Sequence, residues 1–193
     1  MTSALAALLA CAGQTVLYAQ DPIIQTKYTA DPAPMVYNDT VFLYTSHDED
    51  DAQGYGFKML DWQLYTSTDM VNWTDHGPIA SLKDFTWRKR DNGAWALQVV
   101  ERNGKFYMYC PLHGNGIGVL VSDSPYGPFK DPIGKPLVWQ KEHWDDIDPT
   151  VYIDDDGQAY IYNGGGGTCK GGRLKDNMME LDGAMRTMEG LVD

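Results

Sequence analysis

Two stretches of this chain have the same order of parts: an aspartate before a proline, a β-rich run, a tight turn and a second β-rich run. Asp31 begins the first stretch, residues 31–44, and Asp148 begins the second, residues 148–162. Short runs of Val, Ile, Phe and Tyr around an Asn, Asp or Gly turn predict β-hairpins. A third hairpin of this composition is predicted over residues 99–109.

Each predicted hairpin is followed by a second segment in which apolar and polar residues alternate before a turn. These segments are residues 63–73, 117–129 and 172–181. Four strands that recur in this way are typical of β-propeller blades, because one small sheet cannot bury its faces alone. No stretch has a sustained 3.6-residue apolar period, so little helix is expected. The alternative is a β-sandwich, which explains the strands but not their repeated order.

The predicted fold class is therefore all-β, a propeller with about three blades in this chain. Propellers typically close with at least four blades, so we expect residues 21–193 to be the N-terminal part of a larger, truncated domain. The glycine-rich residues 164–172 are interpreted as a flexible connection within the third blade.

The chain is strongly acidic. It has 27 acidic and 15 basic residues and a formal net charge of -12. A charge of this sign argues against nucleic acid or an anionic membrane as a partner. It suits a neutral substrate handled by carboxylates, although an acidic soluble surface alone explains it equally well.

The N-terminal residues differ in composition from the rest. Residues 4–12 form an apolar run of signal-peptide length that is too short to span a bilayer. We therefore interpret residues 1–20 as a signal peptide, which makes the mature protein secreted, periplasmic or extracellular. Because residues 1–3 carry no Lys or Arg, the alternative is a buried or frayed N-terminal segment. Cleavage removes Cys11 and leaves two cysteines, too few for a disulfide framework or a four-ligand zinc site.

Asp31 and Asp148 are the candidate catalytic residues. The innermost strand of each propeller blade lines the axial channel, so residues at the starts of these strands can converge at one mouth. The following prolines disfavour helical geometry at the aspartates and help to fix their direction. Convergent carboxylates suit cleavage of a glycosidic bond, in which one group deprotonates water and another protonates the leaving oxygen. A single Asp-Pro pair is usually the ordinary start of a loop, but two pairs at equivalent places of a repeat favour function.

Several short motifs occur in the order found in glycoside hydrolase family 43, which the chain resembles over roughly residues 25 to 183. The motifs are Ala30-Asp31-Pro32-Ala33-Pro34, Ala94-Trp95-Ala96, Asp146-Ile147-Asp148-Pro149-Thr150-Val151, Asp154-Asp155-Asp156-Gly157 and Leu174-Lys175-Asp176-Asn177-Met178. Within the family, residues 47–51, 59–62 and 67–77 most resemble the arabinoxylan arabinofuranohydrolases and their neighbours.

The resemblance implies a five-bladed propeller and an inverting, exo-acting mechanism. It implies that Asp31 is the general base, and that Asp148 orients the general acid and raises its pKa through like charge. The family's general acid is a glutamate of the fourth blade, usually followed by Gly-Pro. Glu189-Gly190 lacks the following proline, so we expect the acid to lie beyond Asp193.

Four further residues carry weaker signals. The resemblance places Trp95 near the sugar, where its indole face would stack on the ring; core packing is the alternative. His47 and Asp48 begin an acidic run that lines the pocket or forms a solvated loop. His113 is a candidate for an axial channel that holds calcium or water in some family members, and an ordinary loop histidine is the alternative. No cofactor is expected to be required, and a structural calcium ion is the single candidate.

The resemblance implies an exported glycoside hydrolase that hydrolyses O-glycosyl bonds of plant cell-wall hemicellulose, as an α-L-arabinofuranosidase on arabinoxylan. Its partner would be a polysaccharide or an oligosaccharide. A β-xylosidase or an arabinanase of the same family is the alternative within this enzyme class. A carbohydrate-binding propeller fragment without catalysis is the alternative outside it.

Overall fold

The computed structural model describes residues 21–53, 56–140, 146–165 and 167–190, so the predicted signal peptide, residues 1–20, lies outside the described residues. Within these ranges the regular elements are β-strands and one short 3-10 helix, η1 (Leu82–Asp84). The strands are β1 (Tyr28–Tyr37), β2 (Thr40–Asp48), β3 (Asp61–Ser67), β4 (Thr74–Ser81), β5 (Gln98–Arg102), β6 (Lys105–Leu112), β7 (Gly116–Ser122), β8 (Thr150–Ile153), β9 (Ala159–Asn163), β10 (Lys170–Arg173) and β11 (Arg186–Thr187). In the described part of the chain, no helix is long and apolar enough to cross a membrane.

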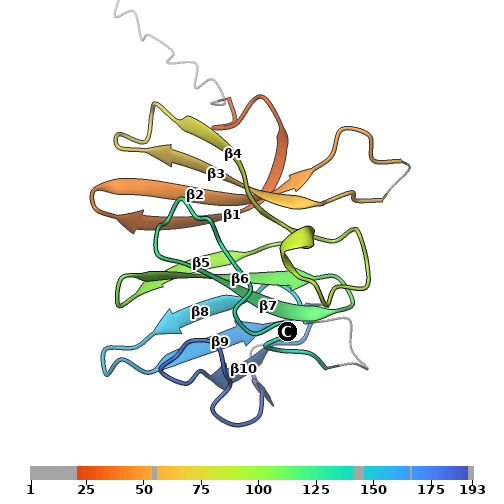
Figure 1. The fold of residues 1–193 in the computed structure, drawn as a ribbon, viewed down its shortest axis with the longest axis vertical. Helices are drawn as coiled ribbons and strands as arrows, with labels where there is room; N and C mark the ends of the chain where they lie inside the picture. Colours follow the sequence, from red (N-terminus) through yellow and green to blue (C-terminus); the bar gives the residue numbers. More distant parts are fainter. Residues whose placement is uncertain (1–20, 54–55, 141–145, 166, 191–193) are drawn as a thin grey trace, which may run out of the picture.

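The strands form three antiparallel sheets that lie one above another (Figure 1). Their strand orders are β1-β2-β3-β4, β5-β6-β7 and β8-β9-β10-β11. The first strands of the three sheets are neighbours, because β5 contacts β1 and also contacts β8. Each sheet therefore presents its first strand to a common inner side, as propeller blades do. The predicted all-β blades are confirmed, and Lys130 pairs with Val121 of β7 where a fourth strand of the second blade would lie.

Two buried apolar clusters fill the spaces between the sheets. β6 contributes to both, because alternate residues of a strand point to opposite faces. Phe106 and Met108 belong to the cluster between the first and second sheets, whereas Tyr107 and Tyr109 belong to the cluster between the second and third. The Tyr109 hydroxyl donates to the Met178 carbonyl oxygen at 2.9 Å, so this buried polar group has a partner. The second blade is thus packed on both faces.

The third blade differs from the prediction in its outer half. The interpretation of residues 164–172 as a flexible connection is wrong for the last three, because β10 starts at Lys170. Close packing favours glycine in this strand: a Cβ atom on Gly171 would lie 2.9 Å from the Tyr162 ring. The alternating segment predicted over residues 172–181 folds back on itself through one bridge, Leu174 with Leu181, and the fourth strand of the blade is β11, later in the chain.

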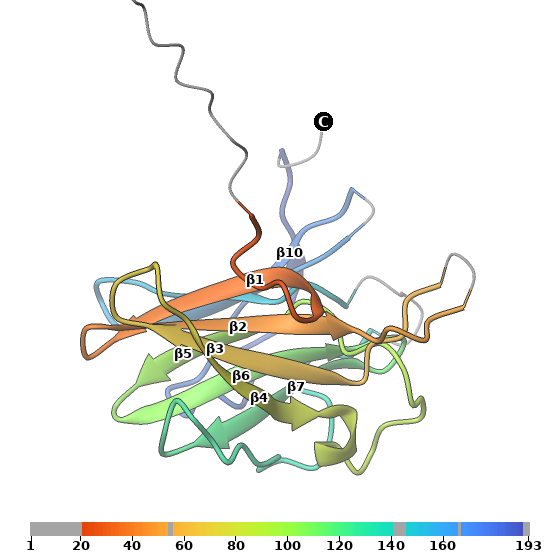
Figure 2. The same cartoon turned by 90° about the horizontal axis from the view of Figure 1, so that it is seen from above.

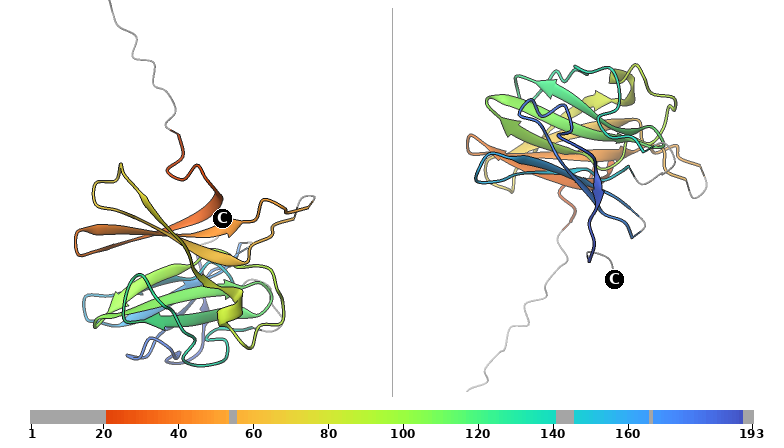
Figure 3. Two further views of the ribbon diagram at one scale, coloured as in Figure 1. Left: turned by 45° about the horizontal axis from the view of Figure 1, so that its top comes forward. Right: turned by 90° about the horizontal axis from the view of Figure 1, so that it is seen from below.

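The innermost strands all start at one end of the blades, which we call the loop end. Tyr28 of β1 pairs with Asp48 at the end of β2, and Thr150 of β8 pairs with Tyr162 near the end of β9. The connection between β2 and β3 extends from the loop end, on the right of Figure 1, whereas the β1–β2, β5–β6 and β8–β9 turns lie on the left. Figures 2 and 3 show this connection projecting from the same end when the molecule is turned. The predicted site residues of all three blades therefore lie at or near the loop end.

Candidate active site

A β-bulge holds Asp31 near the start of β1. Ala30 pairs with Ser46 and Ala33 pairs with Tyr44, so β1 has one residue more than β2 across this step. Asp31 has a φ of 53°, a left-handed conformation that Asp adopts more readily than most residues. The Ser46 hydroxyl donates toward Asp31 Oδ2, 2.8 Å away. Bulges redirect side chains and are frequent next to active sites, and this bulge directs the carboxylate at the loop end.

Asp148 repeats this backbone conformation two residues before β8 starts, with a φ of 50°. The residues that precede it are anchored: the Ile147 carbonyl accepts a hydrogen bond from Gly164 N at 3.1 Å. The buried Asp146 carboxylate accepts another from the Asn163 side-chain amide at 3.4 Å. Both aspartates avoid right-handed helical geometry, as predicted, but through a positive φ rather than the extended backbone that usually precedes proline.

The two aspartates are electrostatically coupled across the blades. The pKa of Asp148 is raised, first because the surrounding protein removes part of the hydration of its carboxylate, and second because the negative charge of Asp31 opposes its ionisation. Both side chains keep contact with solvent. The structure thus brings the two predicted carboxylates close enough to influence each other, at a place that a dissolved sugar can reach.

We expect Asp148→Asn to increase the free energy of unfolding at pH 7. Because the pKa of Asp148 is raised in the folded state, the folded protein binds this proton more tightly than the unfolded chain, and stability falls as the pH rises through that range. The neutral Asn side chain avoids this loss. Urea unfolding of both proteins at pH 7 and at pH 3 measures the effect, which should be present at pH 7 and shrink at pH 3. A variant less stable than the parent at pH 7 contradicts the coupling.

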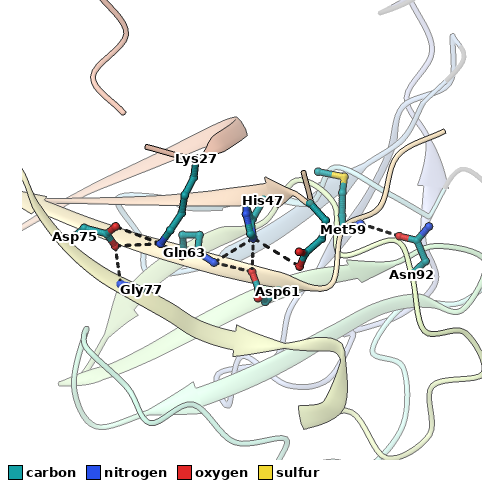
Figure 4. A network of polar contacts seen from close by, with 9 residues as sticks. Lys27, His47, Met59, Asp61, Gln63, Asp75, Gly77 and Asn92 are labelled. Atoms are coloured by element: carbon teal, nitrogen blue, oxygen red, sulfur yellow. Dashed lines mark hydrogen bonds and ion pairs between the residues drawn. The ribbon is translucent and has the colours of Figure 1, made fainter. Parts of the chain in front are cut away.

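His47 lies at the end of β2 in a polar network with residues of β3 (Figure 4). His47 Nδ1 lies 3.1 Å from Asp61 Oδ1, and the Gln63 side-chain amide donates to the same oxygen at 2.6 Å. The Lys27 ammonium group donates to Gln63 Oε1 at 2.9 Å. Asp48, the next residue along β2, instead lines a separate hollow together with Lys27. The structure therefore places the two neighbouring candidates in different surroundings.

The His47 network contains a group of residues of the types that hold metal ions. Ligand atoms of His47, Glu49 and Asp61 lie within 4.8 Å of one another. Among the described residues, these three form the group that could hold a metal ion. Calcium takes roughly six to eight oxygen ligands, whereas this group offers two carboxylates and a ring nitrogen. Asp61 Oδ1 also already accepts the Gln63 amide. Hydrogen bonding accounts for this arrangement, and the residues do not fit a calcium ion.

Trp95 and His113 lie together at the loop end of the second blade. Their ring centroids are 4.2 Å apart. The Trp95 carbonyl oxygen accepts a hydrogen bond from Trp62 Nε1 at 2.7 Å, and its half-buried side chain packs against the first core cluster. The pKa of His113 is lowered, first by burial and second by the positive charge of Arg90. The guanidinium group of Arg90 beside the imidazole disfavours a bound cation there. A calcium ion at His113 therefore stays a prediction, and the charge around His113 speaks against it.

Sequence reasoning missed three polar residues that hold these candidates in place. Ser46 reaches Asp31 because β1 and β2 pair in the observed register, and Asp61 reaches His47 because β2 and β3 pair. The third is Asn92, whose side chain joins two segments of the loop end. Asp61 belongs to residues 59–62, which resemble the family, but its contact with His47 follows only from strand pairing, as does the contact of Ser46 with Asp31. Asn92 lies outside the strands, and no local pattern in the sequence marks it.

Comparison with known proteins shows one consistent similarity. The family described as glycosyl hydrolases family 43 matches residues 19–192. An arabinoxylan arabinofuranohydrolase of Bacillus subtilis (strain 168) is 40% identical over 169 residues, 76% of this chain and 33% of that protein. A xylosidase/arabinosidase of Bacteroides ovatus is 38% identical over 154 residues, 74% of this chain and 45% of that protein. A solved α-L-arabinofuranosidase of Clostridium thermocellum, 41% identical, has a TM-score of 0.71, and the match covers 86% of this chain and 58% of that one.

Proposed function

The chain belongs to glycosyl hydrolase family 43, and we propose that it is part of an inverting, exo-acting hydrolase that removes α-L-arabinofuranosyl groups from arabinoxylan. One observation carries this proposal: Asp31 and Asp148 stand at equivalent places of two blades, both at the loop end, and the charge of Asp31 contributes to raising the pKa of Asp148. Glycosidic cleavage by inversion needs an ionised carboxylate as base and a second carboxyl group kept protonated as acid. A negative neighbour helps to keep that acid protonated.

Asp31 is the proposed general base. Ser46 holds one carboxylate oxygen through its hydroxyl, and the other oxygen is the proposed acceptor of a proton from the attacking water. Asp148 is proposed to orient the general acid and to raise its pKa through like charge. The family resemblance implies that the acid is a glutamate of the fourth blade, and in an inverting enzyme it would stand roughly 6.5–9.5 Å from Asp31 to admit the water.

The chain spans 33% and 45% of the two curated relatives named above, so the substrate is part of the proposal. Arabinoxylan is favoured because the Bacillus subtilis relative is named for it. Cleavage of β-xylosides is the second candidate, since the Bacteroides ovatus relative is named as both xylosidase and arabinosidase. The same proposal includes export of the protein, with residues 1–20 as the signal peptide. Export suits a polymeric substrate that lies outside the cell.

Hydrolysis of p-nitrophenyl α-L-arabinofuranoside and p-nitrophenyl β-D-xyloside tests this function. Two proteins are assayed: the chain as given, and a longer chain extended to the length of its relatives. Nitrophenol release is followed by absorbance. We expect the extended chain to prefer the arabinofuranoside by at least about tenfold in kcat/KM. The opposite preference would assign it as a β-xylosidase. Binding of arabinoxylan without hydrolysis of either glycoside would contradict the enzyme proposal and leave a carbohydrate-binding propeller.

A further inference from the structure

The β-bulge of the first blade occurs again at Asp148. In the third blade Thr150 pairs with Tyr162, and the Ile147 carbonyl oxygen accepts a hydrogen bond from Gly164 N at 3.1 Å. Between these two contacts the inner strand advances three residues and its neighbour advances two, which is the same step as between β1 and β2. Gly164 therefore stands at the place that a serine occupies in the first blade.

Gly164 leaves the Asp148 carboxylate without the support that Asp31 has. In the first blade the Ser46 hydroxyl donates to the Asp31 carboxylate, whereas a glycine has no side chain to donate. A larger residue does not fit there, because a Cβ atom built on Gly164, at a φ of 157°, would lie 2.0 Å from the Thr168 carbonyl oxygen. Among the described residues, none donates a hydrogen bond to the Asp148 side chain. The direction of this carboxylate is therefore set through its backbone.

The backbone at Asp148 needs support from its surroundings. Its φ of 50° is a left-handed conformation, which a residue other than glycine keeps only when neighbouring contacts determine it. The buried Asp146, 3% exposed, supplies such contacts two residues earlier. One of its carboxylate oxygens accepts a hydrogen bond from Gln140 N, and the other accepts one from the Asn163 side-chain amide at 3.4 Å. Asn163 ends β9, so Asp146 ties the segment before Asp148 to that strand.

A buried lysine extends this network. Lys170, 7% exposed at the start of β10, donates from Nζ to Gln140 Oε1 at 2.8 Å. Gln140 therefore joins an acidic and a basic side chain that are both buried. Burial of charged groups is costly unless they are hydrogen-bonded and compensated. These bonds fasten Asp146 to two neighbouring strands, β9 and β10, and make it a fixed point from which the chain reaches Asp148.

We propose that Asp146 is a positioning residue that acts through Asp148, by holding the Asp148 carboxylate in its direction at the loop end. Asp146 fixes the chain two residues before Asp148, and the Ile147 carbonyl fixes it one residue before. The two donors named above are a backbone N–H and a side-chain amide, both neutral, so the role requires acceptor oxygens rather than a negative charge. The proposal rests on the proposed function for the role of Asp148.

Kinetics of p-nitrophenyl α-L-arabinofuranoside hydrolysis by the extended chain test this role. We expect Asp146→Ala to lower kcat about tenfold, the worth of roughly one hydrogen bond, with KM within about twofold of the parent. Asp146→Asn keeps an acceptor for Gln140 N, and Asn163 can turn over its amide group to accept from the new one. This variant should therefore stay within about threefold of the parent in kcat.

Asp131→Ala is the matched control for general damage. The Asp131 carboxylate accepts hydrogen bonds from Ile133 N, Gly134 N and Trp87 Nε1, at 3.0, 2.9 and 2.8 Å. Its removal therefore costs comparable contacts in the second blade, and we expect this variant to keep the kcat of the parent. A control slowed as much as Asp146→Ala overturns the proposal, as does Asp146→Asn slowed to the same extent.

A double variant shows whether Asp146 acts through Asp148. Asp146→Ala should lower kcat no further when it is added to Asp148→Asn, whereas independent effects would multiply. Multiplied losses overturn the proposal, as does a single Asp146→Ala variant that is as fast as the parent.

NMR titration of the Asp148 carboxyl carbon gives a readout that needs no catalysis, and its signal is identified by its absence from Asp148→Asn. Burial is the first cause that raises the pKa of Asp148. A carboxylate released from its position regains hydration, so Asp146→Ala should lower the pKa of Asp148 and Asp131→Ala should leave it unchanged. An unchanged pKa in Asp146→Ala overturns the proposal. If the parent hydrolyses neither glycoside while this pKa falls, the proposed function fails and the positioning role of Asp146 stands.

Discussion

Asp31→Asn lowers kcat of the extended chain on the aryl arabinofuranoside by about 10³-fold, a loss within the range for removal of a general base. The Asn side chain has nearly the same shape and can still accept the Ser46 hydrogen bond, but it cannot take a proton from water. Nitrophenol release measures the loss. Asp39→Asn is the matched control, because Asp39 also has a positive φ, 57°, and lies exposed in the turn at the opposite end of the same hairpin.

An added nucleophile distinguishes a missing base from a damaged fold. Azide needs no deprotonation, so it should restore turnover of the Asp31→Asn variant and leave the Asp39→Asn control unchanged. A structural defect would not be restored in this way. If Asp31→Asn keeps more than about a tenth of the parent's kcat, the general base is another residue.

Asp148→Asn lowers kcat of the extended chain by about 10²-fold and shifts the alkaline limb of its pH–rate profile to lower pH. The negative charge of Asp148 is proposed to hold the pKa of the general acid high, so its removal lets the acid ionise at a lower pH. The profile of kcat/KM between pH 4 and pH 9 measures this shift. Asp155→Asn, in the exposed turn between β8 and β9, is the control for loss of one negative charge at the opposite end of the same blade.

The direction of the shift decides the role of Asp148. An alkaline limb that stays in place while kcat falls would mean that Asp148 positions a group without setting the pKa of the acid. A shift to higher pH would contradict the proposal. Stability provides an independent check, because the same variant is expected to be more stable than the parent at pH 7, and an inactive but stabilised protein has not lost its fold.

Blade number and the candidate aspartates were accessible from the sequence because both depend on local patterns. Strands of alternating residues and tight turns are recognised from neighbouring residues, and Asp31 and Asp148 stand out because the same motif occurs twice. The outer half of the third blade was not accessible in this way. β11 has two residues, Arg186 and Thr187, and such a strand forms only because β10 offers a free edge.

The polar contacts of the site depend on which strands pair and in which register. Ser46 stands 15 residues from Asp31, Gln63 stands 16 from His47, and Asn92 stands 35 from Phe57. Contacts over such separations leave no periodic trace in the sequence. The positive φ values of Asp31 and Asp148 are also hidden, because the following proline by itself favours an extended backbone.

The sequence by itself determined the all-β class, the repeated blades and the two candidate aspartates near the starts of inner strands. Only the tertiary structure decided that these aspartates are coupled through their charges, that His47 and Asp48 have different surroundings, and that Asn92 joins Phe57 to the segment of Trp95. The physical reason is the range of the interactions. Strand and turn preferences act between neighbours in the chain, whereas carboxylate pairs and polar networks form only when the packing of the blades brings distant segments together.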